Sequence, residues 1–230
     1  MHITMPQEKK LHLAIIPDGN RRWARNKALQ PWKGHESAIE VIRRIIEWCR
    51  ENPQIGILTL WLFSTENWKR NPEEIGKLME MLRTYLIEER PNFHRNETRF
   101  VHSGKKERIP KDLATLIRDM EEETAAYGTH TLHLALDYGG RDEIVRAVQR
   151  LGAGEEVSEE KIRAHLDHPE LPDIDIIVRT SGEQRVSNFF LWQGAYAEWF
   201  FVDKLFPDLT TQDIGAIIEQ FTKRSRRFGG

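Results

Sequence analysis

The segment LHLAIIPDGNRRWARN, residues 11–26, carries the pattern that decides the fold. Its first six residues are mostly aliphatic and predict a buried β-strand. Pro17 ends this strand, a tight Asp18-Gly19-Asn20 corner follows, and two arginines come next. Such a corner is typical of a polar turn, but also of a helix N-terminus that binds a phosphate, with Asp18 poised to hold a divalent cation. From this segment alone both interpretations stay open.

The composition is that of a globular protein. Among 230 residues, 34 are lysine or arginine and 36 are aspartate or glutamate, which gives a net charge of −2. With 39% hydrophobic and 30% charged residues, the chain can build a proper core. The balanced charge argues against a dedicated nucleic-acid-binding protein. The single cysteine excludes an internal disulfide and a zinc site built on cysteines.

Two observations bear on the cellular compartment. No apolar run approaches the roughly 18 residues of a membrane-spanning helix. The N-terminal MHITMPQEKK lacks the apolar segment of a secretory signal. The sequence therefore predicts a soluble, cytoplasmic protein without a membrane span.

Short apolar runs alternate with helical patterns along the chain. Strands are predicted at 11–16, 57–63, 98–103, 132–138, 174–180 and 197–203. Helices are predicted at 36–51, 72–90, 110–126, 141–151, 158–167 and 210–226, with Pro91 expected to stop the second of them. The alternation predicts a single α/β domain over residues 1–230, with a central, mainly parallel β-sheet of about six strands flanked by helices.

Ligands of such sheets bind beyond the carboxyl ends of the strands, so the polar residues that follow each strand form the candidate site. The strongest unit is Arg179–Asn188, RTSGEQRVSN, because arginine forks bind phosphate oxygens two at a time. Ser64–Arg70 and Asp137–Arg141 follow two other strands. Glu198 lies in an aromatic segment, where a carboxylate is costly unless it pairs with an arginine or binds a metal.

Five segments resemble, in order, the signature motifs of the cis-prenyltransferases, the family of undecaprenyl diphosphate synthase. They are HLAIIPDGNRRWA, GHESA, LTLWLFSTENWKR, DYGGR and DIDIIVRTSGEQRVSNFFLWQGAYAEWFFVD. The resemblance spans nearly the whole chain, from about His12 to Gly230. It implies a Mg²⁺-dependent enzyme that condenses an allylic diphosphate with isopentenyl diphosphate and releases diphosphate.

The resemblance also implies roles for individual residues. Asp18 resembles the essential aspartate that binds Mg²⁺ with the allylic diphosphate. Asn67, in the mobile segment that closes over the substrates, is the second candidate catalytic residue. Substrate-binding roles are implied for Gly19, Asn20, Arg21, Arg22, Trp23, His35, Ser64, Glu66, Trp68 and Arg70, and isopentenyl diphosphate is expected at Arg179, Arg185 and Ser187.

Two further features of the resemblance imply a homodimer. Glu198 resembles the second metal-linked acid of the family, which reaches the site from the partner subunit. Arg227-Phe228-Gly229 resembles the C-terminal Arg-x-Gly motif. Arg227 and Gly229 are therefore expected to reach across the dimer interface to the substrates.

The chain departs from the family pattern at positions that bear on the product. Pro17 replaces the usual methionine, Pro31 replaces an arginine that helps bind the allylic diphosphate, and Asp137 replaces asparagine. Ile39 and Leu62 fall where long-chain members carry alanine, on the wall of the product tunnel. Because added methylene groups take space from a close-packed wall, we expect a short- or medium-chain Z-prenyl diphosphate of roughly two to four isoprene units.

Other functions remain open from the sequence. One is a long-chain, undecaprenyl-type product, which would allow loose association with a membrane. Another is irregular, branched coupling of two dimethylallyl units, as in lavandulyl-type enzymes. Non-catalytic partner subunits of the family typically lose the first-motif aspartate, which this chain keeps as Asp18. Nucleic-acid binding is suggested only by KRSRR and a few other paired basic residues.

Overall fold

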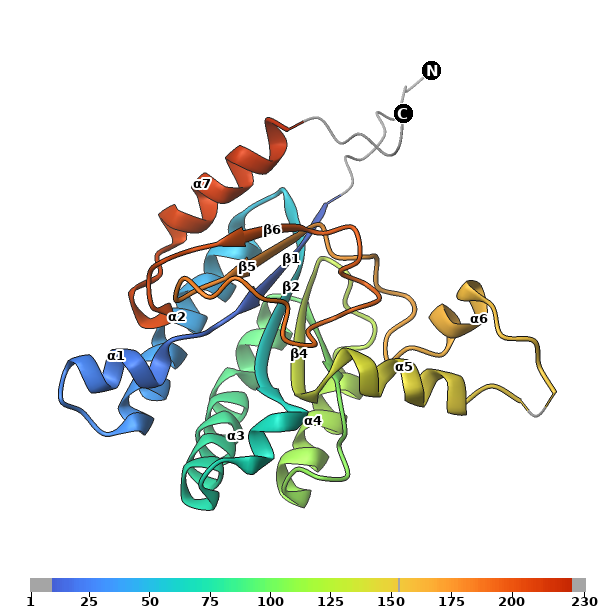
Figure 1. Ribbon diagram of the computed structural model, residues 1–230, viewed down its shortest axis with the longest axis horizontal. Coiled ribbons are helices and arrows are strands. Elements are labelled where there is room, and N and C mark those ends of the chain that lie inside the picture. The colour runs from blue at the N-terminus through green and yellow to red at the C-terminus, as the bar shows by residue number, and fades with distance from the viewer. Residues whose placement is uncertain (1–9, 153, 225–230) are drawn as a thin grey trace.

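The structure is a computed structural model that describes residues 10–152 and 154–224. Its centre is a six-stranded sheet in the order β3–β4–β2–β1–β5–β6, and every neighbouring pair of strands is parallel (Figure 1). The predicted α/β fold is therefore confirmed. The strands are β1 (Leu11–Ile16), β2 (Ile55–Ser64), β3 (Thr98–Ser103), β4 (His130–Tyr138), β5 (Ile176–Arg179) and β6 (Glu198–Phe201).

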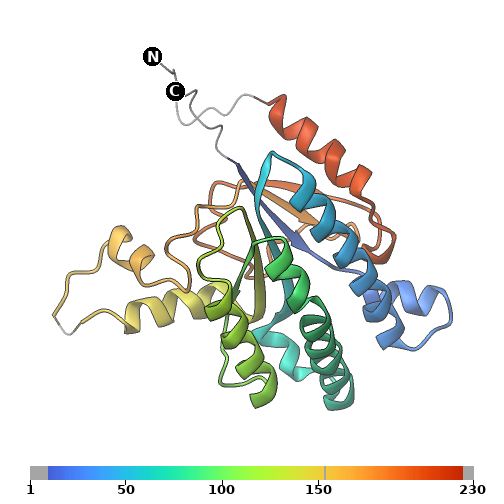
Figure 2. The same ribbon diagram turned by 180° about the vertical axis from the view of Figure 1, so that it is seen from behind.

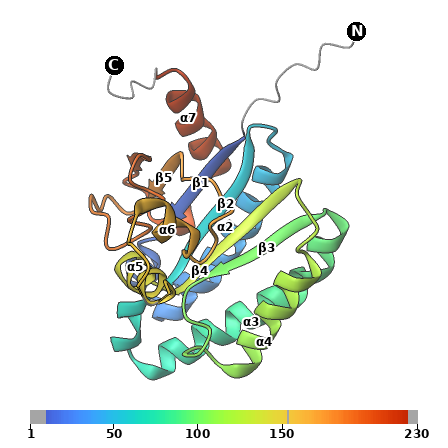
Figure 3. The same cartoon turned by 90° about the vertical axis from the view of Figure 1, so that its right-hand side faces the viewer.

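Helices flank this sheet. They are α1 (Asn20–Asn26), α2 (Pro31–Glu51), α3 (Pro72–Arg95), α4 (Lys111–Glu123), α5 (Gly140–Gln149), α6 (Glu159–Ala164) and α7 (Thr211–Thr222), with 3-10 turns η1 (Thr65–Lys69) and η2 (Phe206–Asp208). α2, α3, α4 and α7 cover one face (Figure 2), while α5 and α6 lie on the other side (Figure 3). Within the described ranges, no helix is both long and apolar enough to cross a bilayer.

Two helix boundaries differ from the predicted ones by five residues, and the other limits differ by less. α2 begins at Pro31 rather than at residue 36, because proline fits the first helical position, where its missing N–H has no partner to lose. α3 continues through Pro91 to Arg95, so the predicted stop at Pro91 was wrong. Tertiary packing holds this end of the helix: Phe93 is buried and contacts Phe100 of β3 edge to face, with the ring centroids 5.7 Å apart.

The two faces of the sheet differ in chemistry. Beneath α2, α3, α4 and α7 the inward side chains are mostly aliphatic, as Leu13, Leu60 and Leu134 illustrate, with a few phenylalanines among them. The opposite face carries a smaller aromatic cluster in which Tyr138 and Phe190 stack with centroids 4.2 Å apart. The larger apolar cluster therefore lies on the α2–α3 side.

A continuous chain of hydrogen bonds crosses four neighbouring strands on the second face. Ser103 Oγ lies 2.8 Å from His133 Nε2, and His133 Nδ1 lies 3.0 Å from Thr59 Oγ1. Thr59 Oγ1 lies 2.7 Å from His12 Nε2, and His12 Nδ1 lies 2.9 Å from the carbonyl oxygen of Pro172. Because that carbonyl only accepts, His12 donates from Nδ1 and accepts from the Thr59 hydroxyl. The Thr59 oxygen then accepts from His133 Nδ1–H, and His133 Nε2 accepts from the Ser103 hydroxyl. Both imidazole rings are therefore neutral, and every hydrogen bond in this row has one donor and one acceptor.

The unfolding free energy is expected to fall as the pH drops below 6.5. Burial lowers the pKa of His133 well below 6.5 and that of His102 to about 3. Below pH 6.5 the unfolded chain therefore binds protons that the folded protein does not, and each such histidine removes about 1.4 kcal/mol per pH unit. His168 acts in the opposite sense: burial lowers its pKa, but hydrogen bonds with Glu170 and the His102 carbonyl, together with the negative charges of Glu170 and Glu121, outweigh burial and raise it.

Urea unfolding of the wild type and of His133→Gln at about pH 7 and about pH 5 measures this effect. Glutamine can still donate to Thr59 and accept from Ser103, so the chain of hydrogen bonds keeps its neutral form. The variant is expected to lose less stability on acidification, by about 1.4 kcal/mol per pH unit. Equal acid sensitivity of the two proteins would contradict the assignment.

Candidate active site

Asp18 lies at the carboxyl edge of the sheet, two residues after β1, and its backbone is held in place. Its N–H donates to Thr180 Oγ1 over 2.9 Å, and the Thr180 hydroxyl donates to its carbonyl over 2.7 Å. Phe206 N–H donates to the same carbonyl over 3.1 Å. Gly19, with a φ of 98° that favours glycine, turns the chain directly into α1. The aspartate is therefore fixed without any ligand.

The Asp18 carboxylate joins the first segment to the arginine segment after β5. Arg179 Nη2 donates to Asp18 Oδ2 over 2.9 Å, and Gly19 N–H donates to Oδ1 over 2.7 Å. Arg179 is only 4% exposed, and its Nη1 donates to Ser187 Oγ over 2.8 Å and to the Arg185 carbonyl. The fold thus brings the two sequence-predicted diphosphate sites into direct contact.

The segment after β2 folds into η1 and turns several polar side chains toward the same place. Ser64 and Asn67 form a reciprocal cap, in which Ser64 N–H donates to Asn67 Oδ1 over 3.0 Å. Ser64, Glu66, Asn67 and Arg70 all line the cavity described below. η1 and the two residues that flank it therefore present four predicted residues to the candidate site.

Trp68 points toward the end of β4 and does not line the cavity. Its indole N–H donates to Asp137 Oδ1 over 2.8 Å, and Arg108 Nε lies 3.1 Å from Asp137 Oδ2. Asp137 is fully buried and has a φ of 51°. Burial raises the pKa of Asp137, although Trp68 and Arg108 favour its charged form. Trp68 therefore ties η1 to the end of β4.

Glu74, in the first turn of α3, gathers basic side chains from three segments. Its Oε1 lies 3.4 Å from Arg21 Nε, 3.8 Å from His35 Nε2 and 4.0 Å from Arg70 Nη1. Burial lowers the pKa of His35 to about 4, and the positive charge of Arg70 adds to this effect. His35 is therefore neutral near pH 7, and the arginines supply the positive charge.

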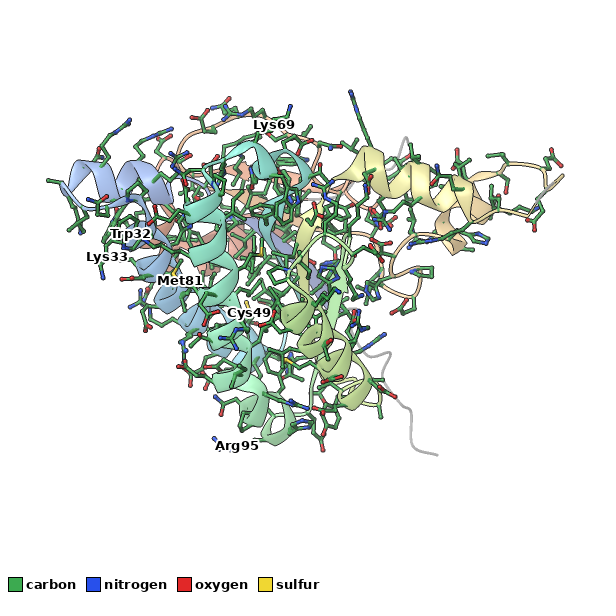
Figure 4. All side chains as sticks on the ribbon, turned by 90° about the horizontal axis from the view of Figure 1, so that it is seen from below. Trp32, Lys33, Cys49, Lys69, Met81 and Arg95 are labelled. Carbon is green, nitrogen blue, oxygen red and sulfur yellow. The ribbon has the colours of Figure 1, made fainter. Side chains whose placement is uncertain are left out.

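These segments border one cavity of about 1090 Å³, slightly above the roughly 300–1,000 Å³ typical of small-molecule sites. Figure 4 views the molecule from below, with Met81 of α3, a lining residue, labelled. The polar mouth is lined by Asp18, Gly19, Asn20, Arg21, Arg22, Arg25, His35, Ser64, Glu66, Asn67, Arg70, Arg179, Arg185, Ser187 and Asn188. The apolar interior, between the sheet and helices α2 and α3, is lined by Ala38, Ile39, Ile42, Ile46, Leu60, Leu62, Leu78, Met81, Leu82, Leu134 and Leu136.

Three buried polar atoms at the mouth have no hydrogen-bond partner within the described part of the chain. They are Asn20 Oδ1, His35 Nε2 and Arg179 Nε, and each belongs to a residue that lines the cavity. Buried polar groups are nearly always satisfied in folded proteins. A ligand that carries several oxygen atoms would satisfy the Arg179 and His35 donors, so these atoms point to a polar ligand.

Some predicted residues are not brought to the mouth. The Trp23 indole N–H donates to Asp208 Oδ1 over 2.8 Å, and Trp23 does not line the cavity. Glu198 begins β6 opposite Ile176, at the amino edge of the sheet, and accepts from Arg224 over 3.1 Å. Within one chain it therefore lies at the opposite edge from Asp18. Arg227 and Gly229 fall outside the described residues.

Two functional candidates, Arg25 and Glu74, escaped the sequence reasoning, and Asn188 was part of the predicted segment Arg179–Asn188 but received no role of its own. Arg25 and Asn188 line the mouth, and Glu74 contacts its arginines. Helical spacing could have found Arg25, because it follows Arg21 at the (i, i+4) distance that puts both on one face of α1. The role of Asn188 depends on a tertiary contact, and no local pattern signals it.

The donor set fits Mg²⁺ only in company with a ligand. Among residues 10–152 and 154–224, no group of three histidine, cysteine or acidic side chains could hold a metal ion. The Asp18 side chain is 34% exposed, and each of its oxygens accepts one hydrogen bond, which leaves further lone pairs. Mg²⁺ commonly binds through one or two carboxylates plus substrate phosphates, so Asp18 with phosphate oxygens is a suitable set.

Comparison with known sequences identifies relatives over almost the whole chain. A family model described as "Putative undecaprenyl diphosphate synthase" matches residues 16–229. An isoprenyl transferase from Wolinella succinogenes is 45% identical over 220 residues, which cover 95% of this chain and 96% of the relative. A tritrans,polycis-undecaprenyl-diphosphate synthase (geranylgeranyl-diphosphate specific) from Pyrococcus horikoshii is 44% identical over 230 residues, covering 95% and 86% of the two chains.

Solved structures give the same result. A lavandulyl diphosphate synthase from Lavandula x intermedia, in complex with dimethylallyl diphosphate, superposes with a TM-score of 0.89 at 31% identity, over 95% of this chain and 98% of that one. A probable undecaprenyl diphosphate synthase from Campylobacter jejuni gives a TM-score of 0.82 at 35% identity, over 96% and 99%. The chain therefore belongs to the cis-prenyltransferase family, that of undecaprenyl diphosphate synthase.

Proposed function

We propose that this prenyltransferase condenses an allylic prenyl diphosphate with isopentenyl diphosphate. The observation that carries the proposal is the cavity, which joins an arginine-rich mouth to an apolar interior. A prenyl diphosphate has the same two parts. The contact between Asp18 and Arg179 supports two diphosphates side by side, as a reaction between them requires.

Each diphosphate is assigned to one side of this contact. The allylic diphosphate is assigned to Asp18, Arg21 and Arg22, and the isopentenyl diphosphate to Arg179 with the neighbouring Arg185 and Ser187. In the reaction, the isopentenyl double bond attacks the allylic carbon as the bond to diphosphate breaks, and a proton leaves the new chain. The arginines stabilise negative charge on the departing oxygens and hold the two substrates in register.

Mg²⁺ is assigned to Asp18 together with oxygens of the allylic diphosphate. When bound, the ion supplies Lewis acidity that neutralises charge on the leaving group. The fixed backbone of Asp18 supports this role, because the carboxylate needs no reorganisation when the substrate arrives. Arg179 keeps the same carboxylate oriented from the other side.

A homodimer is proposed from the exposed edge strand β6. This strand is the last of the sheet, and Phe201 at its end and Tyr196 just before it are 38% and 79% exposed. A strand at the end of the sheet in the described part of the chain, with exposed aromatic side chains beside it, is typical of an interface. Pairing there would also explain how Glu198, which lies far from Asp18 in its own chain, could serve a partner subunit.

The product is proposed to be a short- or medium-chain Z-prenyl diphosphate. Ile39 of α2 and Leu62 of β2 both line the apolar interior. Incubation with radiolabelled isopentenyl diphosphate and several allylic primers, followed by chromatography, tests the reaction and the chain length together. No transfer with any primer would contradict the proposed function, and a main product in the undecaprenyl range would contradict the proposed length.

Widening the cavity is expected to lengthen the product. The double variant Ile39→Ala/Leu62→Ala removes methylene and methyl groups from the lining and should shift the main product by roughly one to three isoprene units. The same chromatography measures the shift. Ile87→Ala is the matched control, because Ile87 of α3 is 51% exposed and does not line the cavity. The same product distribution in the wild type, the double variant and Ile87→Ala would refute the argument that Ile39 and Leu62 limit the product length.

Two other products are supported by particular observations. The 44% identity to an undecaprenyl diphosphate synthase favours a long chain. The TM-score of 0.89 with a lavandulyl diphosphate synthase, together with Pro17 and Pro31 on the cavity wall, favours irregular coupling. NMR of the product distinguishes a branched skeleton from a regular one.

A further inference from the structure

Asn188 occupies a contact point that the proposed function does not yet use. It follows Ser187 in the arginine segment, lines the cavity mouth and lies between η1 and the start of α5. Its Nδ2 donates to Glu66 Oε1 over 3.3 Å, and its Oδ1 accepts from Arg141 N–H over 2.8 Å. One side chain therefore binds two loops that belong to different strands.

The three loops approach one another closely at this point. A Cβ atom at Gly139 would lie 2.7 Å from Asn188 Nδ2 and 2.9 Å from Thr65 Oγ1, which leaves no room for a side chain. Gly140 N–H donates to the Asn188 carbonyl over 2.7 Å. The segments that follow β2, β4 and β5 thus meet at Asn188. Because they are closely packed there, a displacement of one segment must displace the other two.

The backbone at this point is held in an uncommon conformation. Ser187 and Asn188 have φ values of 49° and 68°, and consecutive non-glycine residues in the left-handed region persist only where surrounding contacts hold them. One such contact is the bond from Arg179 Nη1 to Ser187 Oγ. The position of Asn188 therefore depends on how Arg179 and Ser187 are engaged.

We propose that Asn188 is a positioning residue that couples the isopentenyl diphosphate site to η1. The inference rests on the proposed function, which assigns that diphosphate to Arg179 and Ser187. A diphosphate there replaces part of the bonding that holds the Ser187–Asn188 backbone, and Asn188 transmits the change to Glu66. η1, which carries Asn67 and is followed directly by Arg70, is then stabilised at the mouth when the isopentenyl site is filled. Because coupling is reciprocal, a stabilised η1 also tightens isopentenyl diphosphate binding.

Asn188→Asp separates coupling from a purely local role. Aspartate tolerates the left-handed backbone and can still accept from Arg141 N–H, so the start of α5 keeps its hydrogen bond. The donor to Glu66 is lost, and two carboxylates face each other. A role confined to the local backbone would leave this variant unchanged.

Amide hydrogen exchange of residues 64–70, with and without isopentenyl diphosphate, is the decisive measurement. In the wild type, isopentenyl diphosphate is expected to slow exchange by at least about fivefold. Asn188→Asp is expected to lose this protection while its thermal midpoint stays the same. The inference would be overturned if isopentenyl diphosphate left the exchange rate of the wild type unchanged, or if it protected Asn188→Asp as well as the wild type.

Three further proteins complete the test. Glu66→Gln added to Asn188→Asp restores an amide facing a carboxylate and is expected to restore protection. Glu66→Ala removes the same bond from the η1 side and should lose protection too, which decides the matter if Asn188→Asp does not fold. Trp68→Phe loosens η1 on the Asp137 side, so it should speed exchange but retain protection by the ligand.

Calorimetric titration of the wild type with isopentenyl diphosphate separates this inference from the proposed function. Absence of binding would contradict the proposed function itself. Binding without protection of residues 64–70 would contradict only the coupling through Asn188.

Discussion

Replacing Asp18 with asparagine is expected to lower kcat for prenyl transfer by at least about 10³-fold. Asparagine keeps the size of the side chain and an oxygen that can accept from Gly19 N–H. It removes the negative charge that holds Mg²⁺ with the allylic diphosphate in the proposed function. Incorporation of radiolabelled isopentenyl diphosphate at saturating substrate measures the loss. Because asparagine also replaces the acceptor of Arg179 with an N–H donor, the thermal midpoint of the variant is measured beside kcat, and an unchanged midpoint assigns the loss to the chemical step.

The control for this experiment is Asp112→Asn, an equivalent change at a carboxylate of α4 that is 64% exposed. It should leave kcat within about threefold of the wild type, as is usual for surface substitutions. An Asp18→Asn variant that keeps more than a tenth of the activity would sink the assignment. It would also revive the possibility of a non-catalytic partner subunit.

Replacing Arg179 with lysine is expected to raise the KM for isopentenyl diphosphate by about 10- to 100-fold. Lysine keeps the charge but loses the planar fork, which donates at once to Asp18, Ser187 and the Arg185 carbonyl. Arg179 is 4% exposed, so water cannot readily replace the lost hydrogen bonds. Steady-state kinetics with isopentenyl diphosphate varied at saturating allylic primer measure the change.

Arg185→Lys is the matched comparison, because the Arg185 side chain is 57% exposed and its lost bonds can be replaced by water. Its effect on the same KM should be smaller than tenfold. If Arg179→Lys instead raised the KM for the allylic primer alone, Arg179 would belong to the other diphosphate site, and the assignment of the two sides would be reversed.

Much of the fold could be predicted because periodicity and strand–helix alternation are local signals. The strand 11–16 is found with the same limits in the structure, and the carboxyl ends of β1, β2 and β5 meet at one cavity. The stop at Pro91 failed because the packing of Phe93 against Phe100 outweighs the cost of a proline inside the helix. Propensity cannot register a contact with a strand that comes later in the chain.

The sequence predicted which residues lie at the candidate site better than it predicted where their side chains point. Ser64–Arg70 was correctly expected at the edge of the sheet, but Trp68 turns to the buried Asp137 while Asn67 and Arg70 face the cavity. The backbone conformation of η1 determines the direction of each side chain. Contacts with β4 and with the segment after β5 fix that conformation. Sequence motifs identify such residues without saying which way they point.

The hydrogen-bonded row of His12, Thr59, His133 and Ser103 also disfavours pairing of the strands in a shifted register. Successive side chains of a strand point to opposite faces, so a slip of one residue would move each of these polar groups to the α2–α3 face. Next to Thr59 and His133 in the chain stand Leu60 and Leu134, which line the apolar cavity. An out-of-register strand would bury an imidazole in hydrocarbon and break the row on both sides. The same row that joins four strands therefore selects the one alignment that leaves room for a prenyl chain.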